Sequence, residues 1–458
     1  MASPGRTSGA PWRRELQCCI KDSKNGKHTP RFWASGRDHA EEGIAITTDT
    51  LLGGLDPDLI VEIDVSSNEF KHNWVQHMIN WSTRPPLYAV WNNTLMVMVG
   101  RHADALEVFS DRERFSVEVP RQPGFERFDK FYGVKALPQT DGANHDRLRK
   151  LANPAYGPAA MRRFEPELVH IIDKMLDVLP TDGSEFNMVD LFSDHLIVRV
   201  MLDGMFKLDD EQKAVFNQMR AVIPLATMLP PGSEFPKVYV DAFAATKATI
   251  LDLIAERREH PVDDLISRLV HAREEDDRLT DTELHDEIFT LCATTLQSTS
   301  SAMGGLLITL WKHPDQLELV LNDRSLVRSA VEEGLRCHGP ALFTFARFAL
   351  EDTEVAGTPI RKGMVVRVAT AAADIDPTAY PEPLRFDVRR NPQRILPFGW
   401  GPHLCIAQRL ARLVLNKSLE RILDRFPTLE LVDIDFEPTY RGQVGEVVPD
   451  SILMRIPA

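Results

Sequence analysis

Residues 397–413 read PFGWGPHLCIAQRLARL, and the interpretation of the whole chain depends on this stretch. Its glycine-rich turn leads to one cysteine, Cys405, at the predicted start of an amphipathic helix. The first turn of a helix presents unpaired backbone N–H groups and the positive end of the helix dipole, which favour a thiolate. Glycines allow the backbone to bend tightly and to approach a flat ligand closely. The stretch therefore predicts a thiolate ligand at Cys405, with Phe398 shielding its sulfur from water.

The spacing around the cysteine is F-G-x-G-x-H-x-C, formed by Phe398, Gly399, Gly401, His403 and Cys405. This spacing resembles the haem-binding loop of the cytochrome P450 family. The glycine that usually follows the cysteine in this family is replaced by Ala407, which is small enough to leave room for the cofactor. A buried free cysteine is the simpler alternative, but several matched positions around one cysteine favour the cofactor. The resemblance implies haem b, with Cys405 as the axial ligand of the iron.

The resemblance also implies the fold, which is mainly α with a small β-rich subdomain in a single large domain. Residues 1–45 show no sustained periodicity, so we expect a flexible N-terminal extension followed by a catalytic domain over 46–458. A capping box formed by Thr280 and Glu283 begins a predicted helix that runs to about Lys312 and spans roughly 46 Å. Apolar periodicity predicts further helices over 68–82, 145–152, 158–179, 188–206, 209–220 and 236–258, and strands over 87–91, 95–99, 355–360 and 365–370.

Composition restricts the class of protein. The chain has 458 residues, of which 26% are charged and 43% hydrophobic, as in an ordinary globular protein with a large core. The net charge of −14 argues against nucleic acid as a partner. No apolar run approaches the ~18 residues that a membrane-spanning helix needs, and the N-terminus lacks a secretory signal. The five cysteines form no disulfide or zinc pattern. We therefore expect a soluble, monomeric, bacterial-type enzyme of the cytoplasm, without a membrane anchor.

A pair of charged residues upstream matches the brace that supports the haem loop in this family. Glu333 and Arg336 lie on one face of a predicted helix, where their side chains can form an ion pair. Such pairs usually decorate a solvated surface. The order of Glu333, Arg336 and the later segment DPTAYPEPLRFD favours the structural role, and Arg385 is the expected third member of the network.

Four cationic or donor side chains match the residues that hold the haem propionates in this family. His145 and Arg149 lie one helical turn apart, and Arg347 and His403 are the other matched positions. The fork of an arginine suits a carboxylate. A surface salt bridge is the alternative for each residue taken alone.

The long helix departs from the family pattern at the position that usually carries an acid followed by an alcohol. Here the residues are Gln297 and Ser298, followed by Thr299. A glutamine can orient water but cannot ionise, so it cannot act as a general acid. Three explanations remain open: water or substrate groups deliver the protons, the enzyme uses hydrogen peroxide, or the reaction is a rearrangement. The two hydroxyls could also simply bond back to the helix backbone.

The same matching identifies candidate residues of an apolar substrate pocket. Leu342, Phe343 and Thr344 are expected to pass beside the haem, and Phe125, Phe128, Leu296 and Val444 to complete the cavity. Each of them could equally belong to the core. Apolar walls favour a hydrophobic substrate of the terpenoid, steroid or aromatic type.

The resemblance implies a monooxygenase that hydroxylates this substrate with O2 and electrons from a redox partner. Four basic residues after the cysteine could dock a ferredoxin or flavodoxin-type donor with its reductase, although they could also form a solvated helix face: Arg409, Arg412, Lys417 and Arg421. The alternatives are a peroxygenase that uses H2O2, an enzyme of this family with atypical proton delivery, and a non-catalytic haem-binding protein.

Overall fold

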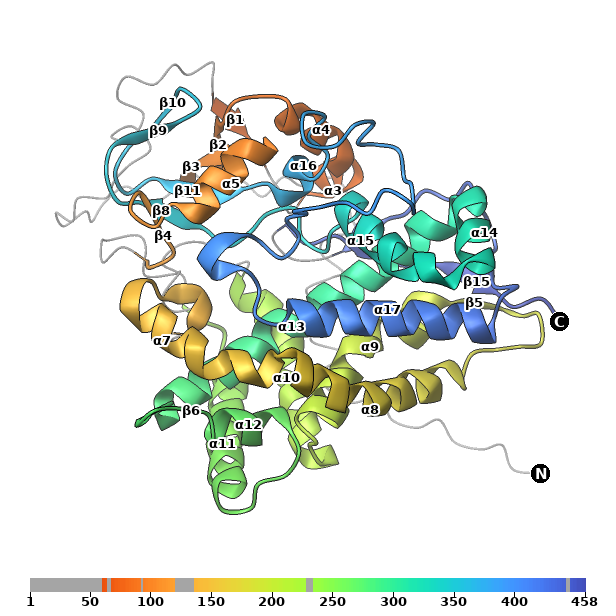
Figure 1. Cartoon of the computed structure of the whole chain (residues 1–458), viewed down its shortest axis with the longest axis horizontal. Coiled ribbons are helices and arrows are strands. Elements are labelled where there is room, and N and C mark those ends of the chain that lie inside the picture. Colours follow the sequence, from red (N-terminus) through yellow and green to blue (C-terminus); the bar gives the residue numbers. More distant parts are fainter. Residues whose placement is uncertain (1–59, 64–66, 92–93, 120–135, 228–233, 442–444) are drawn as a thin grey trace. The chain divides into compact units, whose positions relative to one another are not determined.

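Helix α13, Asp281–Trp311, is the longest helix of the described residues and lies at the centre of the helical part (Figure 1). It begins at the predicted capping box, in which the side chains of Thr280 and Glu283 each accept a hydrogen bond from the other residue's backbone N–H. α13 packs against helices on several sides, among them α9 (Asp194–Arg199), α11 (Lys237–Glu259) and α15 (Val327–Cys337). Because α13 is long and packs against helices on several sides, its side chains can make contacts at both of its ends.

The computed structural model describes residues 60–63, 67–91, 94–119, 136–227, 234–441 and 445–458. All of these residues belong to one compact unit, Ala45–Ala458. The predicted extension over 1–45 and the pocket candidates Phe125, Phe128 and Val444 lie outside the described residues. The backbone of Leu296 belongs to α13, but its side chain also lies outside the description.

Helices dominate the unit. Besides α9, α11, α13 and α15 they are α3 (Asn68–His72), α4 (Trp74–Ser82), α5 (His102–Ser110), α7 (Gly142–Ala152), α8 (Pro158–Leu176), α10 (Asp210–Thr227), α12 (Leu265–Val270), α14 (Pro314–Asn322), α16 (Thr370–Ala373) and α17 (Gln408–Arg425). Their apolar faces join one large core cluster that includes Leu306 of α13 and Leu419 of α17. Among the described residues no helix is both long enough and apolar enough to cross a membrane.

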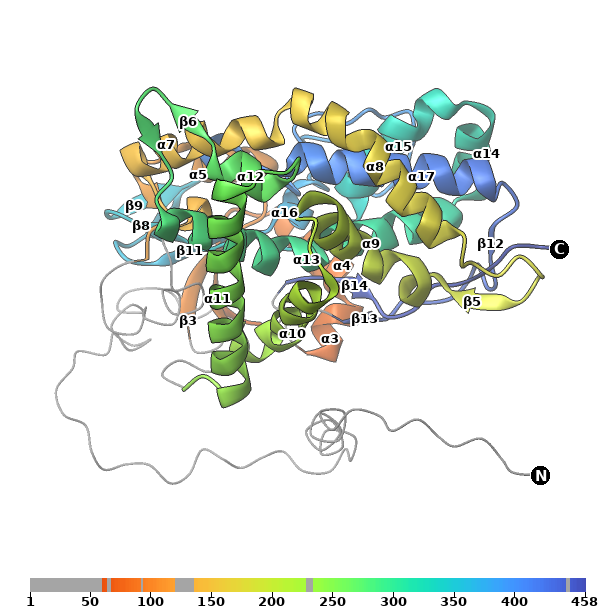
Figure 2. The ribbon, with the colours of Figure 1, turned by 90° about the horizontal axis from the view of Figure 1, so that it is seen from below.

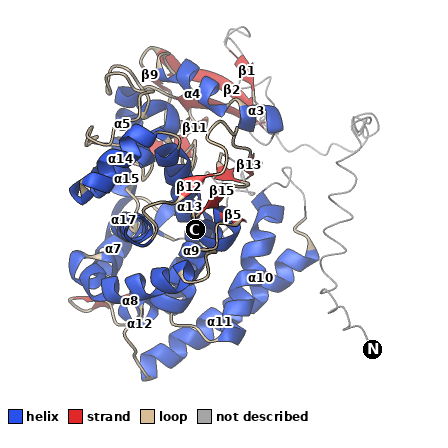
Figure 3. Ribbon diagram, turned by 90° about the vertical axis from the view of Figure 1, so that its right-hand side faces the viewer, coloured by secondary structure: helices blue, strands red, loops and turns tan. Residues whose placement is uncertain are grey.

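The strands form a smaller part with its own core. A six-stranded sheet has the order β1 (Ile60–Glu62), β2 (Leu87–Trp91), β3 (Thr94–Val99), β11 (Val365–Val368), β8 (Arg347–Ala349) and β4 (Phe115–Ser116). β3 pairs antiparallel with β2 and parallel with β11. A second sheet joins β12 (Glu430–Leu431), β15 (Leu453–Arg455) and β5 (Glu185–Asn187). Figure 3 shows β1, β2 and β11 at one edge of the unit and α8, α11 and α12 at the other. The predicted fold class, mainly α with a small β-rich part, is confirmed.

Three predicted elements differ from the structure. The helix over 68–82 is interrupted at Asn73, and the helix over 188–206 consists of π-helical turns on both sides of α9. The strand over 355–360 is wrong, because the chain turns back there and joins β9 (Thr353–Val355) to β10 (Thr358–Ile360). Ala356 and Gly357 adopt positive φ angles of 49° and 83° at this turn. The alternation of hydrophobic residues did not predict this turn, because a single glycine is a weak turn signal in the sequence.

Candidate active site

The loop before α17 presents Cys405 to the interior. Gly399 and Gly401 adopt φ angles of 68° and 70°, which residues with a side chain rarely adopt. A Cβ atom at Gly401 would also lie 2.8 Å from the carbonyl oxygen of Phe109, so α5 packs directly on this turn. The backbone N–H of Cys405 donates to the carbonyl oxygen of Phe398 at 2.9 Å. The cysteine therefore stands just before α17, whose N-cap is Ala407, rather than inside its first turn.

Electrostatics at Cys405 differ from the prediction in one respect. Burial raises the pKa of the Cys405 thiol, and this effect outweighs the backbone N–H groups of Ala407 and Gln408 and the charges of Arg149 and Arg412. The end of the helix alone therefore does not favour a thiolate. A cation bound at the sulfur would remove the proton instead, as metals do at cysteine ligands. The guanidinium of Arg412 lies 4.4 Å from the ring centre of Phe398 and covers the ring that shields this loop.

A cavity of about 540 Å³ extends from this loop to α13. Its lining comes from segments far apart in the sequence, including α7, α10, α13, β8 and the cysteine loop, and it contains Cys405 and Phe398. Cys405 is half-buried and lines this cavity. The cavity is open enough to hold a flat cofactor and a small molecule above it.

All four predicted propionate contacts line the cavity, and two of them, Arg149 and Arg347, have no ion-pair partner among the described residues. Nδ1 of His145 binds Asp146 at 3.0 Å. Nε2 of His145 is buried and has no hydrogen-bond partner, and within the described residues Arg149 and Arg347 make neither a hydrogen bond nor an ion pair. Arg347 is only 5% exposed and lies 4.6 Å from the ring centre of Phe109. Burial lowers the pKa of Arg347 to about 10. Buried charges without partners are costly, so this donor set fits a ligand that carries carboxylates, as the propionates of haem do.

The fourth predicted contact, His403, already has a protein partner. Its Nε2 lies 2.7 Å from Oδ1 of Asp141, and its ring centre lies 4.3 Å from that of His145, with the two rings tilted by 52°. Burial would raise the pKa of Asp141, but the hydrogen bonds from His403 and Ser116 hold it well below its ordinary value. Asp141 was not predicted, since no local motif links it to a histidine so far away in the sequence. Only the other ring nitrogen of His403 is left for a propionate.

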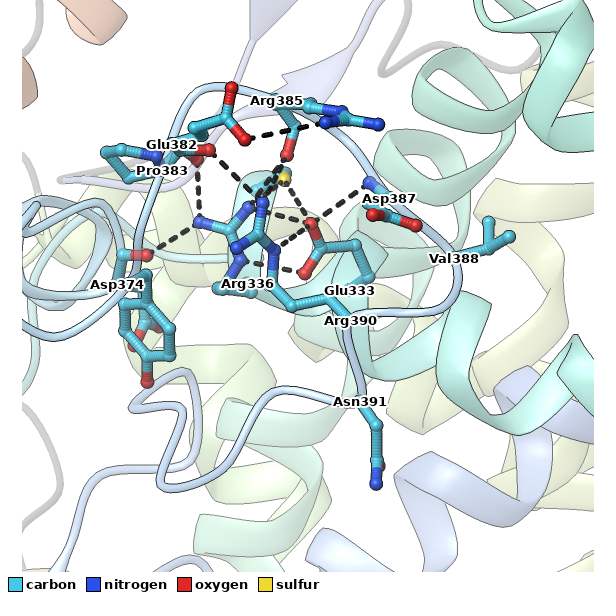
Figure 4. A network of polar contacts seen from close by, with 12 residues as sticks. Glu333, Arg336, Asp374, Glu382, Pro383, Arg385, Asp387, Val388, Arg390 and Asn391 are labelled. Carbon is cyan, nitrogen blue, oxygen red and sulfur yellow. Dashed lines mark hydrogen bonds and ion pairs between the residues drawn. The ribbon is translucent and has the colours of Figure 1, made fainter.

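The predicted brace is present, but its third member was wrong (Figure 4). Arg336 forms two hydrogen bonds of 2.8 Å with the carboxylate of Glu333, and both side chains are fully buried. The third guanidinium is that of Arg390, whose Nε lies 2.9 Å from Oε1 of Glu333. The side chain of Arg385 instead points to solvent and pairs with Glu382 at 3.4 Å. Arg385 contributes only its carbonyl oxygen, because the loop after Pro383 folds back and brings Arg390 over the glutamate.

The three residues singled out on the long helix all border the cavity. Gln297 and Ser298 are half-buried, while Thr299 is almost completely buried. Ser298 donates to the carbonyl oxygen of Thr294 at 3.3 Å, which is the local back-bonding that the sequence left open. The amide of Gln297 has no hydrogen-bond partner within the described residues. It is therefore available to water or to a ligand in the cavity.

The pocket candidates divide into two groups. Phe343 and Thr344 line the cavity, as predicted. Leu342 does not, and its assignment was wrong: the side chain is 1% exposed and packs in the core of the β-rich part. Its N–H donates to the carbonyl oxygen of Gly445, and this bond turns the leucine away from the cavity.

Four charged residues of the cavity were missed: Arg220, Glu287, Arg367 and Glu446. Glu287 of α13 is 6% exposed, and one carboxylate oxygen accepts a hydrogen bond of 2.7 Å from the N–H of Leu137. Burial raises the pKa of Glu287 to about 7. Arg220 of α10 also lines the cavity. The helical spacing of Glu287, Thr290 and Thr294 places them on one ridge and could have indicated the glutamate.

The basic residues of α17 are mostly paired within the protein. Arg412 binds Glu332, Lys417 binds Glu165 and Glu420, and Arg421 binds Asp173. Of the four predicted residues, Arg409 alone is exposed without a partner among the described part of the chain. This pairing favours the simpler interpretation of a solvated, charge-balanced helix face.

Comparisons with known proteins agree with this geometry. A family model described as Cytochrome P450 matches residues 68–451. The chain is 33% identical over 321 residues to the 6-deoxyerythronolide B hydroxylase of Saccharopolyspora erythraea, covering 70% of this chain and 78% of that protein. It is also 33% identical over 328 residues to a steroid C26-monooxygenase of Mycobacterium tuberculosis, covering 70% of this chain and 86% of that protein.

A solved structure shows the same fold. The polyketide synthase cytochrome P450 PksS of Bacillus subtilis has a TM-score of 0.77 at 24% identity, covering 86% of this chain and 99% of that chain. The relatives are named hydroxylases and monooxygenases, and proteins of this kind bind haem through a cysteine thiolate. The family model spans most of the sequence, including the cysteine loop, the brace and the long helix. The chain belongs to the cytochrome P450 family.

Proposed function

We propose that this enzyme hydroxylates a hydrophobic small molecule, using O2 and electrons from a ferredoxin or flavodoxin-type partner with its reductase. The observation that carries the proposal is the cavity itself, which runs from Cys405 to Gln297, Ser298 and Thr299 and has mostly apolar walls. Two relatives are named a 6-deoxyerythronolide B hydroxylase and a steroid C26-monooxygenase, and steroids are hydrophobic. The same class of substrate is proposed here, including the terpenoid, steroid and aromatic types.

The proposal assigns a role to several side chains of the cavity. Cys405 would hold the iron through its sulfur, and His145, Arg149 and Arg347 would hold the propionates, with His403 contributing its second nitrogen. Haem bound there supplies the activation of oxygen. Phe343 and Thr344 would contact the substrate, and the ring of Phe398 under Arg412 would keep water away from the sulfur.

Proton delivery is the atypical part of the proposal. The amide of Gln297 can hold a water molecule in the cavity but has no proton of its own to release. The hydroxyl of Ser298 is directed to the carbonyl of Thr294 and must rotate before it can donate into the cavity. Water held by Gln297 is therefore the proposed carrier. The glutamine in place of an acid at position 297 favours a second candidate, a peroxygenase, because H2O2 brings its own protons.

The redox partner and the location belong to the same proposal. With Arg412, Lys417 and Arg421 already paired, the partner would meet a nearly neutral surface around Arg409 rather than a basic patch. Association should then depend only weakly on salt. Among the described residues Cys292, Cys337 and Cys405 are all free thiols, which supports a reducing compartment such as the cytoplasm.

The test compares two oxidant systems with the purified holoenzyme, namely O2 with an electron-donor chain and H2O2 alone. Macrolactones, steroids and fatty acids are first screened for a low-to-high-spin shift, and the binders are incubated either with a ferredoxin, its reductase and NADPH or with H2O2. We expect hydroxylated product mainly with the electron donors. Product that forms only with H2O2 would instead establish the peroxygenase, and binding without product from either source would indicate a non-catalytic haem protein.

Two cysteine variants serve as controls for the ligand assignment. Cys405→Ala should abolish the red-shifted Soret band of the reduced carbon-monoxide complex, because the thiolate is lost. Cys292→Ala removes another free thiol that lines the same cavity and should leave this band unchanged. A band that survives in Cys405→Ala would contradict the assignment.

A further inference from the structure

The cations of the cavity outnumber those that the cofactor requires. His145, Arg149 and Arg347 come from α7 and β8 and fit the two propionates. A further arginine, Arg220, lies on α10 and lines the cavity together with Ile223 and Ala226 of the same helix. Figures 2 and 3 place α10 and α17 on opposite sides of α13, so Arg220 belongs to the side away from the cysteine loop.

The guanidinium of Arg220 has no partner of its own. Its Nε is buried without a hydrogen bond, and among the described residues no ion pair is formed by this side chain. The carboxylate of Asp194 interacts electrostatically with Arg220, but Asp194 already binds Arg441 through a hydrogen bond and ion pair. Two guanidiniums thus share one carboxylate, which leaves one positive charge uncompensated. Arginine stays ionised even where burial lowers its pKa, as it does here.

Arg220 is half-buried with its Nε buried, and a charge partly withdrawn from water is costly unless a ligand supplies the missing partner. Arg367 also lines the cavity, but it differs from Arg220 because its Nη1 donates a hydrogen bond to the carbonyl oxygen of Thr344 at 3.2 Å. Apolar residues such as Ile197 and Ile223 line the same cavity as Arg220. This combination of a fork-shaped cation and apolar walls is suited to a carboxylate on a hydrocarbon skeleton.

We infer that Arg220 is a substrate-binding residue that selects hydrophobic molecules with a terminal carboxylate. The inference rests on the proposed function, since it assigns the cavity above the haem to the substrate. The carboxylate binds Arg220 at α10, and the hydrocarbon part extends along α13 toward Gln297. Hydroxylation then falls at a distance from the carboxylate rather than beside it. The charge selects the substrate, while the length of the hydrocarbon selects the carbon atom.

The test measures binding rather than turnover, so it is independent of how the enzyme receives its electrons. Long-chain fatty acids and their methyl esters are titrated into the holoenzyme, and the dissociation constants are determined by calorimetry and by the spin-state shift. Wild type should bind the acid more tightly than the ester. Arg220→Gln should weaken acid binding by about ten- to a hundredfold and leave ester binding nearly unchanged. Arg220→Lys should restore part of the preference.

Lys213→Gln provides a matched control. It removes one positive charge from the same helix, but Lys213 is paired with Asp203 at 2.8 Å and does not line the cavity. This variant should keep the full preference for the acid. Equal binding of acid and ester by wild type, or an equal loss in Lys213→Gln and Arg220→Gln, would overturn the inference. Failure of the electron-donor assay would not affect these outcomes, because binding precedes the reaction.

Discussion

At the scale of single residues, the site is marked by charges whose protein partners are missing. Arg347 is buried against Phe109 and forms no ion pair among the described residues, and the charge of Asp141 only partly offsets the cost of its burial. We expect a bound ligand to neutralise such a buried charge. The same argument separates Arg347, which is proposed to bind the propionates, from Arg336, whose carboxylate partner is part of the chain.

Replacing Arg347 with methionine should have opposite effects on the two forms of the enzyme. In the haem-free protein the change removes an uncompensated charge, so the free energy of unfolding should rise by about 1–2 kcal/mol. In the holoenzyme it removes a charged hydrogen bond to a propionate, so haem loss should accelerate roughly ten- to a hundredfold. Urea unfolding and haem transfer to a scavenging apoprotein measure the two effects.

Arg409→Met is the control for this pair of measurements, because Arg409 is exposed and lies outside the cavity. It should change neither the unfolding of the haem-free protein nor the rate of haem loss. Destabilisation of both forms by Arg347→Met would show that Arg347 has only a structural role.

The corrected brace yields a comparison between two arginines of one loop. Arg390→Met removes the second guanidinium from the buried carboxylate of Glu333 and should destabilise the holoenzyme by about 2–3 kcal/mol. Arg385→Met removes an exposed pair with Glu382 and should cost less than about 0.5 kcal/mol. Guanidinium chloride unfolding measures both. Equal losses in the two variants would contradict the network of Figure 4.

At the scale of elements, α13 carries the departure of this enzyme from its family. The helix presents Glu287 near its first turns and Gln297 farther along, and both border the cavity. The family's acid would stand at Gln297, but the chain keeps its buried carboxyl at Glu287 instead. The acidic neighbours Glu283 and Asp286 disfavour ionisation of Glu287, while Arg149 favours it.

The raised pKa of Glu287 predicts how stability depends on pH. The folded protein holds this proton up to about pH 7, whereas the ordinary pKa of a glutamate is 4.5. Between these values the folded state binds more protons than the unfolded state, so stability falls as the pH rises. The full loss is at most roughly 3 kcal/mol. Glu287→Gln should abolish it, so the variant should gain stability relative to wild type between pH 5 and pH 8.

Unfolding of wild type and Glu287→Gln by urea over this pH range checks the prediction. Glu211→Gln on the exposed face of α10 is the control and should follow the wild-type curve. A difference between Glu287→Gln and wild type that stays constant with pH would mean that Glu287 does not titrate there.

At the scale of the whole molecule, the site is assembled from both structural parts. The β-rich part supplies Arg347 and Phe343, and the helical part supplies His145, Arg149 and the residues of α13. Local patterns were enough to predict several of these residues, because family motifs and the spacing of one helical turn persist in the structure. They could not predict that Asp141 lies beside His403 or that Arg220 of α10 lines the cavity, because these contacts depend on how distant segments of the chain pack.

The sequence alone established the cofactor loop, the long helix with its capping box and the pairing of Glu333 with Arg336, because each depends on residues within a few positions of one another. The tertiary structure decided which arginine completes the brace, which side Leu342 faces and which charges border the cavity. The physical reason is the range of the interactions involved. Backbone geometry is set by neighbouring residues, whereas the burial and pairing of a charge are set by segments that only folding brings together.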